Sequence, residues 1–285
     1  MGHTLLSVGH GFTAQEFGRF VQARGWHVIG TTRSADKAAA LAEQGVEAVV
    51  WPGTDLTPQI ARANHILISA APDEQGDTFL RAYEAALKAA PNLCWIGYLS
   101  TTGVYGDHGG AWVDEDTPVV PTTKRGQIRA RSEQQWLDSG LPAHVFRLAG
   151  IYGPGRGPFA KLKGGTARRI IKPGQVFGRI HVEDIAQGLY ASTLAPNPGR
   201  IYNLTDDEPA PPDDVLGYAA ELLGMDLPAP VAFEEAEMSP MARSFYAECK
   251  RVRNDRMKQE LGVQLKYPGY KAALDAIYAA EFGAS

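Results

Sequence analysis

Short hydrophobic runs alternate with amphipathic stretches along the first half of the chain. The runs predict strands at Thr4–Val8, His27–Thr31, Ala48–Trp51, His65–Ser69, Leu93–Leu99 and His144–Leu148. Between them, apolar residues at helical spacing predict helices that end beside glycine or proline, at Phe12–Arg24, Ala35–Gln44, Asp77–Ala90 and Gln127–Ser139. Because strands that alternate with helices form crossover units, we expect an α/β fold with a parallel sheet covered on both faces.

The pattern changes after residue 149. A segment rich in glycine and proline covers residues 150–158, and strand-like runs then occur at Arg179–Val182 and Arg200–Asn203. Further helices are predicted at Ile185–Thr193, Asp213–Leu223, Asn254–Leu261 and Tyr270–Ala280. We expect a first domain of residues 1–149, rejoined by residues of about 177–204, and a smaller C-terminal α/β cap of residues 150–285 that is interleaved with it.

Composition narrows the class of protein. The 285 residues include 28 Lys and Arg against 32 Asp and Glu, a net charge of −4, so we expect no nucleic-acid partner. Cys94 and Cys249 lie far apart and outside any CxxC pair, so we expect no metal site and no disulfide framework. The chain has no leader-like start and no run of about 20 apolar residues, so we expect a cytoplasmic protein without a membrane partner.

A glycine-rich loop follows the first predicted strand and opens the first predicted helix. It fits the pattern G-x-G-x-x-G/A with Gly9, Gly11 and Ala14, and Phe12 begins the helix. The glycines allow the backbone to approach a pyrophosphate, and the helix supplies N–H donors to it. The loop therefore predicts a Rossmann-like, doubly wound dinucleotide-binding domain. The alternative is a glycine turn that only packs the helix on the strand.

The end of the second predicted strand bears on the choice of cofactor. An acidic residue there would bind the ribose 2′-hydroxyl of NAD, but the chain has Thr32, Arg33 and Ser34, with Lys37 one helical turn later. Arg33 can bind a 2′-phosphate through two hydrogen bonds, and the two hydroxyls can donate to it. We therefore expect NADP in preference to NAD. The alternative is that Arg33 only begins an exposed helix.

Five further segments resemble the extended short-chain dehydrogenase/reductase family, which includes the NAD(P)-dependent epimerases and dehydratases. They follow in the family's order and are Leu99–Gly106, Glu115–Pro118 with Pro121, Phe146–Arg156, Arg179–Ala186 and Ile201–Asp207. The resemblance implies a C-terminal substrate domain beside the dinucleotide-binding domain. It also implies that the loop after the fourth strand lines the cofactor cleft, with Ser69, Ala70, Ala71 and Pro72. Family members often pair through two helices, here Asp77–Ala90 and Gln127–Ser139, so we expect a homodimer in which Trp136 is a core or an interface residue.

The chain departs from the family at its catalytic pair, Tyr-x-x-x-Lys. The register of Gly126 and Glu133 puts Arg125 at the tyrosine position and Arg129 at the lysine position. Arg129 can still hold the nicotinamide ribose, whereas a guanidinium has no accessible neutral form, so Arg125 cannot be the acid or base. It can bind an anion or stabilise an oxyanion. The family's hydroxyl at the end of the fifth strand corresponds to Thr101, with a hydrogen-bonding role.

Proton transfer therefore needs another group. Tyr105 and Tyr152 lie in motifs that approach the cofactor cleft in the family, although each can equally be a packing tyrosine. His108 and His181 can titrate near neutrality. The alternative for His108 is that it belongs to a turn, and the alternative for His181 is that it is a structural residue in a strand.

Two basic features can bind an anionic substrate. Arg156 follows the Tyr-Gly-Pro-Gly turn, where a solvated loop arginine is the alternative. In the tail, spacing of three to four places Arg243, Tyr246, Lys250 and Arg253 on one helix face, where a salt-bridged surface helix is the alternative.

Together these observations predict an NADP-binding oxidoreductase or epimerase with non-standard acid/base residues. Its substrate would be a small molecule that is polar or anionic. The candidate catalytic residues are Thr101, Tyr105, Arg125 and Arg129. A non-catalytic NADP-binding sensor or scaffold protein is the alternative, because the catalytic tyrosine and lysine are replaced.

Overall fold

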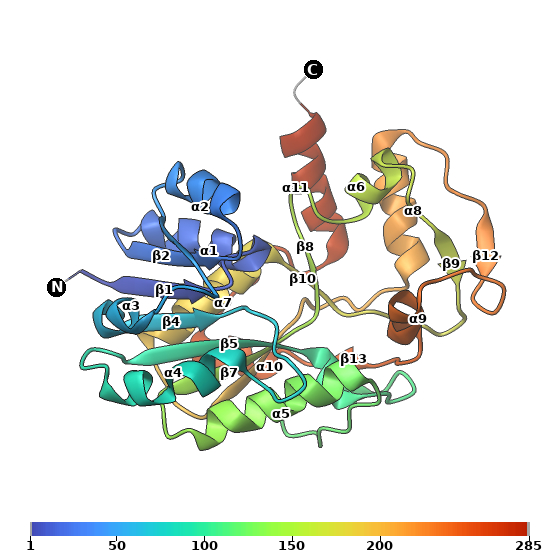
Figure 1. Cartoon of the computed structure of the whole chain (residues 1–285). Coiled ribbons are helices and arrows are strands. Elements are labelled where there is room, and N and C mark those ends of the chain that lie inside the picture. Colours follow the sequence, from blue (N-terminus) through green and yellow to red (C-terminus); the bar gives the residue numbers. More distant parts are fainter. Residues whose placement is uncertain (1, 284–285) are drawn as a thin grey trace.

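The computed structural model describes residues 2–283 and contains a seven-stranded sheet, as Figure 1 shows. The strand order is β11-β7-β5-β4-β1-β2-β3, and every neighbouring pair is parallel. The strands are β1 (Thr4–Val8), β2 (His27–Thr32), β3 (Glu47–Val50), β4 (His65–Ile68), β5 (Trp95–Thr101), β7 (Ala143–Leu148) and β11 (Ile201–Leu204). The predicted doubly wound α/β fold is confirmed.

Helices cover both faces of this sheet because its strands are apolar on both sides. Leu5 of β1 packs in the core with α1 (Phe12–Gln22), α2 (Ala35–Ala42), α7 (Val182–Leu194) and α10 (Asp255–Leu261). Its neighbour Leu6 points to the opposite core, which contains α3 (Thr57–Arg62), α4 (Thr78–Ala89) and α5 (Lys124–Asp138). Trp136 of α5 is fully buried in that second core, so it is a core residue and not part of the expected dimer interface. The homodimer stays a prediction.

The order of the strands positions the site. The chain moves outward in one direction through β1, β2 and β3, and then in the other through β4, β5, β7 and β11. The loops after β1 and β4 therefore diverge at the carboxyl edge of the sheet, which is where open α/β sheets bind their ligands.

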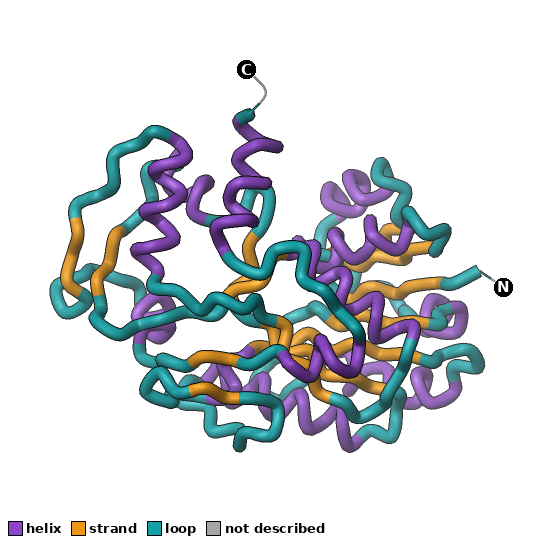
Figure 2. The backbone as a smooth tube through the Cα atoms, turned by 180° about the vertical axis from the view of Figure 1, so that it is seen from behind, coloured by secondary structure: helices purple, strands orange, loops and turns teal. Residues whose placement is uncertain are grey.

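The C-terminal part forms a smaller layer above this edge (Figures 1 and 2). Its core contains Tyr152, Phe159 and residues of two packed helices, α8 (Pro212–Leu223) and α11 (Tyr270–Phe282). The layer also contains α6 (Pro158–Lys163), α9 (Pro240–Tyr246) and two pairs of parallel strands, β10 (Arg179–His181) with β8 (Gly150–Tyr152) and β12 (Pro230–Ala232) with β9 (Arg169–Ile171). A further parallel pair, β13 (Arg251–Val252) with β6 (Trp112–Val113), packs with η1 (Thr102–Tyr105) in a separate small core against α5. The predicted domain boundary at residue 149 stays a prediction.

The predicted basic face on one tail helix is wrong. Helix α9 ends at Tyr246. Further along, the chain has an extended conformation in β13, where Arg251 pairs with Trp112 of β6. Lys250 lies between the two elements, and its Nζ donates to the carbonyl oxygen of Gly106 at 2.6 Å. Helical spacing therefore does not hold beyond Tyr246, and strand pairing separates Arg253 from α9.

Within residues 2–283, no helix has the length and apolar character that crossing a membrane requires.

Candidate functional site

The glycine-rich loop makes a tight turn between β1 and α1. Gly9 has φ +79°, and a Cβ atom on it would lie 2.7 Å from the backbone nitrogen of Ala70. The Gly9 N–H donates to Thr31 Oγ1 at 2.8 Å, which ties the loop to β2. Only glycine fits here, because the turn needs a positive φ and the loop after β4 is in contact.

The buried side chain of His10 packs beneath the glycine-rich loop, between α1 and β2. The Nδ1 atom of its ring is in hydrogen-bond contact with Ser7 Oγ at 2.9 Å. Gly18 of α1 and Gly30 of β2 make room for the ring, since a Cβ on either would lie within 3 Å of it. Burial lowers the pKa of His10 to about 4, so the ring is neutral at pH 7 and acts as packing. Sequence analysis did not single out His10, because it occupies a variable position of the motif.

The loop has the space and the donors that a pyrophosphate needs. Gly11 precedes α1, and a Cβ on it would meet only the Gly9 carbonyl oxygen, at 3.9 Å. The first-turn N–H groups of α1, beginning with Phe12, have no intrahelical partners. The Arg156 guanidinium lies 5.2 Å from the centre of the Phe12 ring, so a cation stands beside these donors. The residues present therefore fit the diphosphate of a dinucleotide.

The predicted adenosine end lies at the exposed tip of β2. Arg33 is exposed, and it makes no ion pair within residues 2–283. Thr32 ends β2, and Ser34 caps α2 by accepting from the Lys37 N–H. None of these four residues lines the cavity described below, so their contact with the cofactor stays a prediction.

Only part of the loop after β4 reaches the cavity described below. The N–H groups of Ser69 and Ala70 both donate to the Val8 carbonyl oxygen, which holds this loop against β1. Ser69 lines the cavity, Ala70 packs on Gly9, and Ala71 is exposed outside it.

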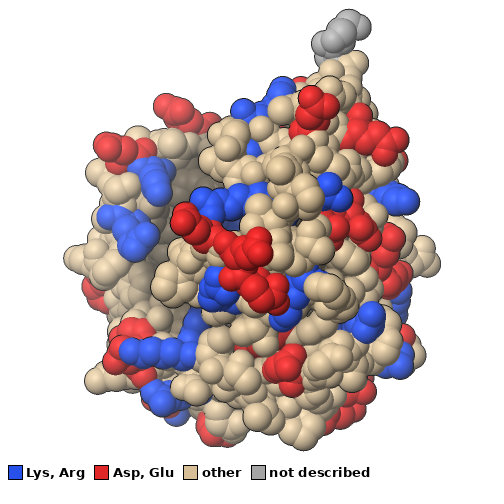
Figure 3. All heavy atoms as spheres, turned by 90° about the vertical axis from the view of Figure 1, so that its right-hand side faces the viewer, with Lys and Arg blue, Asp and Glu red and all other residues tan. Residues whose placement is uncertain are grey.

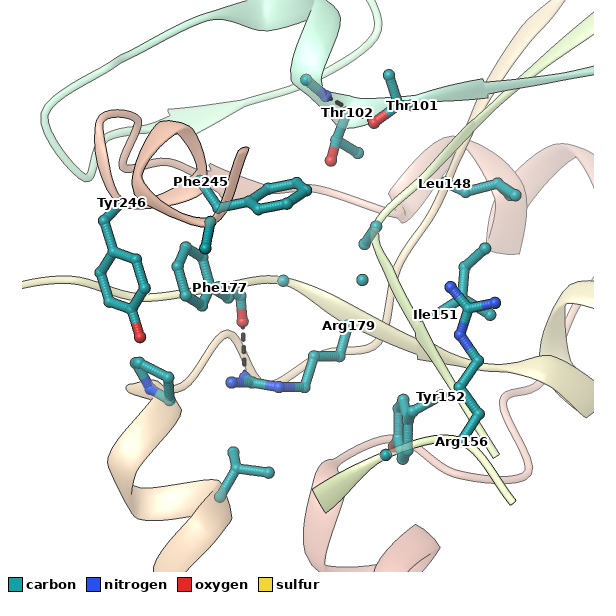
Figure 4. A pocket seen from close by; sticks show the side chains of 18 of the residues that line it. Thr101, Thr102, Leu148, Ile151, Tyr152, Arg156, Phe177, Arg179, Phe245 and Tyr246 are labelled. Carbon is teal, nitrogen blue, oxygen red and sulfur yellow. Dashed lines mark hydrogen bonds between the residues drawn. The ribbon is translucent and has the colours of Figure 1, made fainter. Parts of the chain in front are cut away.

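A cavity of about 1150 Å³ runs from the start of α1 along the carboxyl edge of the sheet and under the C-terminal layer. Figure 4 shows Thr101 and Thr102 on one side of it, with Phe245 and Tyr246 of α9 across from them. Thr101 Oγ1 accepts from the Gly103 N–H at 3.1 Å, so the Thr101 hydroxyl proton is free to point at a ligand. The cavity joins the phosphate loop to the predicted catalytic segment.

Two arginines of α5 line the cavity. Arg129 donates to the Leu99 carbonyl oxygen at 2.7 Å, which fixes it at the end of β5 and leaves further guanidinium donors. Arg125 lies one turn earlier, 5.9 Å from the centre of the Phe245 ring. Within the described residues neither arginine forms an ion pair. Their arrangement suits an anion or a ligand oxygen.

Tyr105 lies outside the cavity, which corrects its place among the candidate catalytic residues. It is fully buried, its hydroxyl donates to Asn203 Oδ1 at 2.8 Å, and Arg147 Nη1 donates to that hydroxyl at 2.9 Å. Burial raises the pKa of Tyr105 to about 12. The hydroxyl is saturated by internal partners, so Tyr105 is a packing tyrosine.

Arg147 also forms a buried ion pair with Glu133 of α5. The Nη2–Oε2 distance is 2.8 Å, and each side chain is 4% exposed. Ser100 donates a further hydrogen bond to Glu133. Together with the Ser100 hydrogen bond, the pair joins β5, β7 and α5 one helical turn after Arg129, so it holds this part of the site in place.

Tyr152 does line the cavity. It is buried, and its hydroxyl has no hydrogen-bond partner within the described residues. Its ring packs edge-on against His181, with ring centroids 5.4 Å apart. His181 Nδ1 caps α7 by accepting from the Glu183 N–H, and burial lowers the pKa of His181 to about 4. His181 is therefore a neutral structural residue. His108 lies outside the cavity, with Nε2 bonded to the Tyr105 carbonyl oxygen.

Sequence analysis missed most of the wall that the C-terminal layer provides. Phe177, Arg179, Met238, Met241 and Phe245 line the cavity. These side chains come from loops, from the start of the short strand β10 and from the short helix α9, where no periodic pattern marks them. In residues 2–283 no group of three or more His, Cys, Asp or Glu is placed to hold a metal ion.

A comparison with protein-family models finds no match. Protein YeeZ of Escherichia coli strain K12 is 30% identical over 279 residues, which cover 92% of this chain and 95% of that protein. A conserved protein of unknown function from Silicibacter pomeroyi has 57% identity and a TM-score of 0.93, over 98% of this chain and 99% of that one. A structure from Methylobacillus flagellatus, assigned as an NAD-dependent epimerase/dehydratase, has 27% identity and a TM-score of 0.72, over 98% of each chain.

Two solved structures below 20% identity share the fold and contain a nicotinamide cofactor. The human epimerase family protein SDR39U1 with NADPH has a TM-score of 0.74, 19% identity and coverage of 96% of this chain and 98% of that one. UDP-glucuronic acid 4-epimerase from Bacillus cereus with NAD has a TM-score of 0.77, 17% identity and coverage of 99% of each chain. Similarity along almost the whole of YeeZ, together with this shared architecture, shows that the chain belongs to the extended short-chain dehydrogenase/reductase family of NAD(P)-binding oxidoreductases and epimerases.

Proposed function

We propose that the protein is an NADP(H)-dependent oxidoreductase or epimerase that acts on a small polar or anionic molecule. One observation carries the proposal: a single cavity connects the start of α1, where a diphosphate fits, to Thr101 and the two arginines of α5. When bound, the cofactor supplies or accepts a hydride at its nicotinamide ring. The cavity leaves room for a second small molecule beside it.

Three lining residues have separate roles in this proposal. Arg129, held by the Leu99 carbonyl oxygen, hydrogen-bonds the nicotinamide ribose. Thr101 donates a hydrogen bond from its free hydroxyl to the substrate oxygen at the carbon that changes, and so stabilises charge that develops on this oxygen. Arg125 binds an anionic group or a developing oxyanion, and it stays protonated throughout.

The preference for NADP rests on Arg33. A free guanidinium at the tip of β2, next to the hydroxyls of Thr32 and Ser34, suits a 2′-phosphate and offers no acceptor to a ribose 2′-hydroxyl. The cofactor in the SDR39U1 structure is also NADPH.

A non-catalytic NADP-binding sensor is the second candidate. The observation that favours it is that α5, from Lys124 to Asp138, contains no tyrosine and has arginines facing the cavity. Both candidates bind the nucleotide, but only the enzyme couples it to turnover. Oxidation of NADPH with any aldehyde, ketone or sugar substrate, lost in Thr101→Ala, excludes the sensor.

Cofactor binding is tested by titrating the protein with NADPH and with NADH while tryptophan fluorescence is followed. We expect Gly11→Asp to abolish NADPH binding, because its carboxylate enters the space for the pyrophosphate. The uncharged control of similar size, Gly11→Asn, separates charge from bulk. A folded Gly11→Asp variant with unchanged NADPH affinity would refute the proposal.

The nucleotide preference is tested with Arg33→Met. We expect it to weaken NADPH binding at least tenfold, about 1.4 kcal/mol, and to leave NADH binding unchanged. Lys88→Met is the matched control, since Lys88 is an exposed cation on α4 and pairs with Glu84. Equal losses in the two variants would show that Arg33 does not recognise the 2′-phosphate.

A further inference from the structure

The cavity is strongly basic although the chain is acidic. Its lining contains one acidic residue, Glu248, whereas the whole chain has a net charge of −4. The face of the molecule that carries the C-terminal layer is hollowed, and both Lys or Arg and Asp or Glu side chains lie at the rim of the hollow (Figure 3). The lining cations are Arg125, Arg129, Arg156, Lys161, Arg168, Arg179 and Lys250. A ligand of this cavity is therefore an anion.

Several of these cations already have partners. Lys250 forms an ion pair with Glu248 at 2.7 Å, and Thr122 also donates to Glu248, so the one acidic side chain of the lining is engaged. Arg179 donates to the carbonyl oxygens of Phe177 and Ala210. Arg156 lies beside Phe12 at the phosphate loop, where the charge of a cofactor accounts for it.

Like Lys161, Arg125 has no side-chain partner within the described residues. It is exposed to the cavity, and within the described residues it makes neither a hydrogen bond nor an ion pair. It lies in the first turn of a 15-residue helix, where a positive charge opposes the helix dipole. Burial and the like charge of Arg129 lower the pKa of Arg125. A bound anion would offset the unfavourable charge of Arg125 at the helix N-terminus and its repulsion from Arg129.

The wall opposite Arg125 is apolar and aromatic. Phe245 is 53% exposed, and Figure 4 shows its ring directed across the cavity towards Thr102. Phe177 packs edge-on against Tyr246 with ring centroids 5.3 Å apart, and both line the cavity together with Met238 and Met241 of the same segment. This wall buries an apolar body and offers it ring faces.

The lining lacks the side chains that most often hold a sugar ring. Among the described residues that line the cavity there is no Asn, Gln, Asp or His, and the one carboxylate is engaged. The remaining side-chain acceptors are hydroxyls such as those of Thr101 and Thr102. The combination of an unpaired guanidinium with the Phe245 ring 5.9 Å away favours an aromatic anion over a sugar.

We propose that the substrate is a carboxylic acid with an apolar, aromatic body, whose carboxylate binds Arg125 and whose body packs between Phe245 and Phe177. The inference rests on the proposed function, because it assigns the substrate class of the same cavity. It gives the arginine that replaces the family's tyrosine a binding role: two parallel N–H···O bonds to the carboxylate.

The test measures binding of three probes by calorimetry to protein saturated with NADP⁺. The probes are 3-phenylpropanoate, its methyl ester and UDP-glucose. We expect the acid to bind and the ester to bind at least tenfold more weakly, since it lacks the charge. Phe245→Ala weakens binding of the acid, and UDP-glucose does not bind.

Two variants of α5 separate the role of Arg125 from general charge. Arg125→Met is expected to weaken binding of the acid at least tenfold while NADP⁺ affinity stays within twofold. Arg131→Met is the matched control, because Arg131 is exposed on the same helix outside the cavity and donates to the Glu74 carbonyl oxygen. It is expected to change neither affinity.

The outcomes distinguish the two proposals. Failure of the wild-type protein to bind NADP⁺ overturns the proposed function and the inference with it. Normal NADP⁺ binding overturns the inference alone if 3-phenylpropanoate does not bind, if acid and ester bind equally, if UDP-glucose binds more tightly, or if Arg125→Met behaves like Arg131→Met. A parallel loss of NADP⁺ and acid binding in Arg125→Met assigns Arg125 to the cofactor and also overturns it.

Discussion

The buried ion pair between Arg147 and Glu133 should dominate the stability of the site. Arg147 donates to the Glu133 carboxylate through Nε at 3.2 Å and Nη2 at 2.8 Å, and it donates to the Tyr105 hydroxyl through Nη1. Arg147→Met removes all these donors and leaves a carboxylate that is 4% exposed with a hydrogen bond from Ser100. Removal of one partner of such a pair costs about 3–5 kcal/mol, because the remaining charge is buried and uncompensated.

The measurement is urea unfolding followed by tryptophan fluorescence, with calorimetry as a second probe. For a chain of this size the expected loss corresponds to a drop in Tm of roughly 5–10 °C. Arg62→Met is the control, because Arg62 forms a comparable two-bond pair with Glu47 at the surface, where such a pair contributes about 0–1 kcal/mol. The double variant Glu133→Leu/Arg147→Met should be more stable than Arg147→Met alone, since it removes the orphaned charge.

Two results would refute this reasoning. The first is a cost of Arg147→Met no larger than that of Arg62→Met. The second is strict additivity, in which the double variant loses as much unfolding free energy as the two single variants together. Additivity would show that Arg147 and Glu133 act independently.

Three further predictions concern other parts of the chain. Burial raises the pKa of the Asp206 carboxyl from 3.8 to about 8, so between these pH values the folded state holds a proton that the unfolded state has released. The free energy of unfolding therefore falls as the pH rises from about 4 to about 8. Asp206→Asn should therefore reduce the fall in unfolding free energy over this range by up to about 1.4 kcal/mol per pH unit, and equal pH profiles for the two proteins would contradict it. Gly9→Ala should lower Tm and weaken NADPH binding together, because its Cβ meets the backbone of Ala70; an unchanged melting curve and affinity would show that the turn adapts. Gly97→Ala should destabilise by about 1–3 kcal/mol, because the Trp95 indole lies over Gly97; urea unfolding measures this, and a loss below about 0.5 kcal/mol would show that the indole moves aside at little cost.

Much of the fold could be predicted from local patterns. Strands such as β1 and β4 are apolar on both faces and bounded by turns, so their position follows from hydrophobicity alone. The six-residue helix α3 (Thr57–Arg62) was missed because it is too short to show a period. The tail was misassigned because α9 stops at Tyr246, and long-range pairing with β6 determines the conformation of the chain beyond that residue.

The part of the site that could be predicted is the part whose geometry follows from a local sequence motif. Gly9 and Gly11 occupy the predicted turn because backbone conformation determines that motif locally. Tyr105 was assigned to the wrong environment because its partner Asn203 lies 98 residues away, and no local pattern reveals that contact. Phe245 and Phe177 were missed for the same reason, because a helix and a loop that are far apart in the sequence form this cavity wall only through tertiary packing.

The late return of the chain to the sheet constrains how the protein folds during synthesis. Strand β11 completes one edge of the sheet beside β7, and Met257 and Val263 pack in the same core as α1. A nascent chain that ends near residue 149 therefore exposes both an unpaired strand edge and a bare apolar face. The sheet edge and the core under α1 therefore become complete only after about residue 263 has left the ribosome.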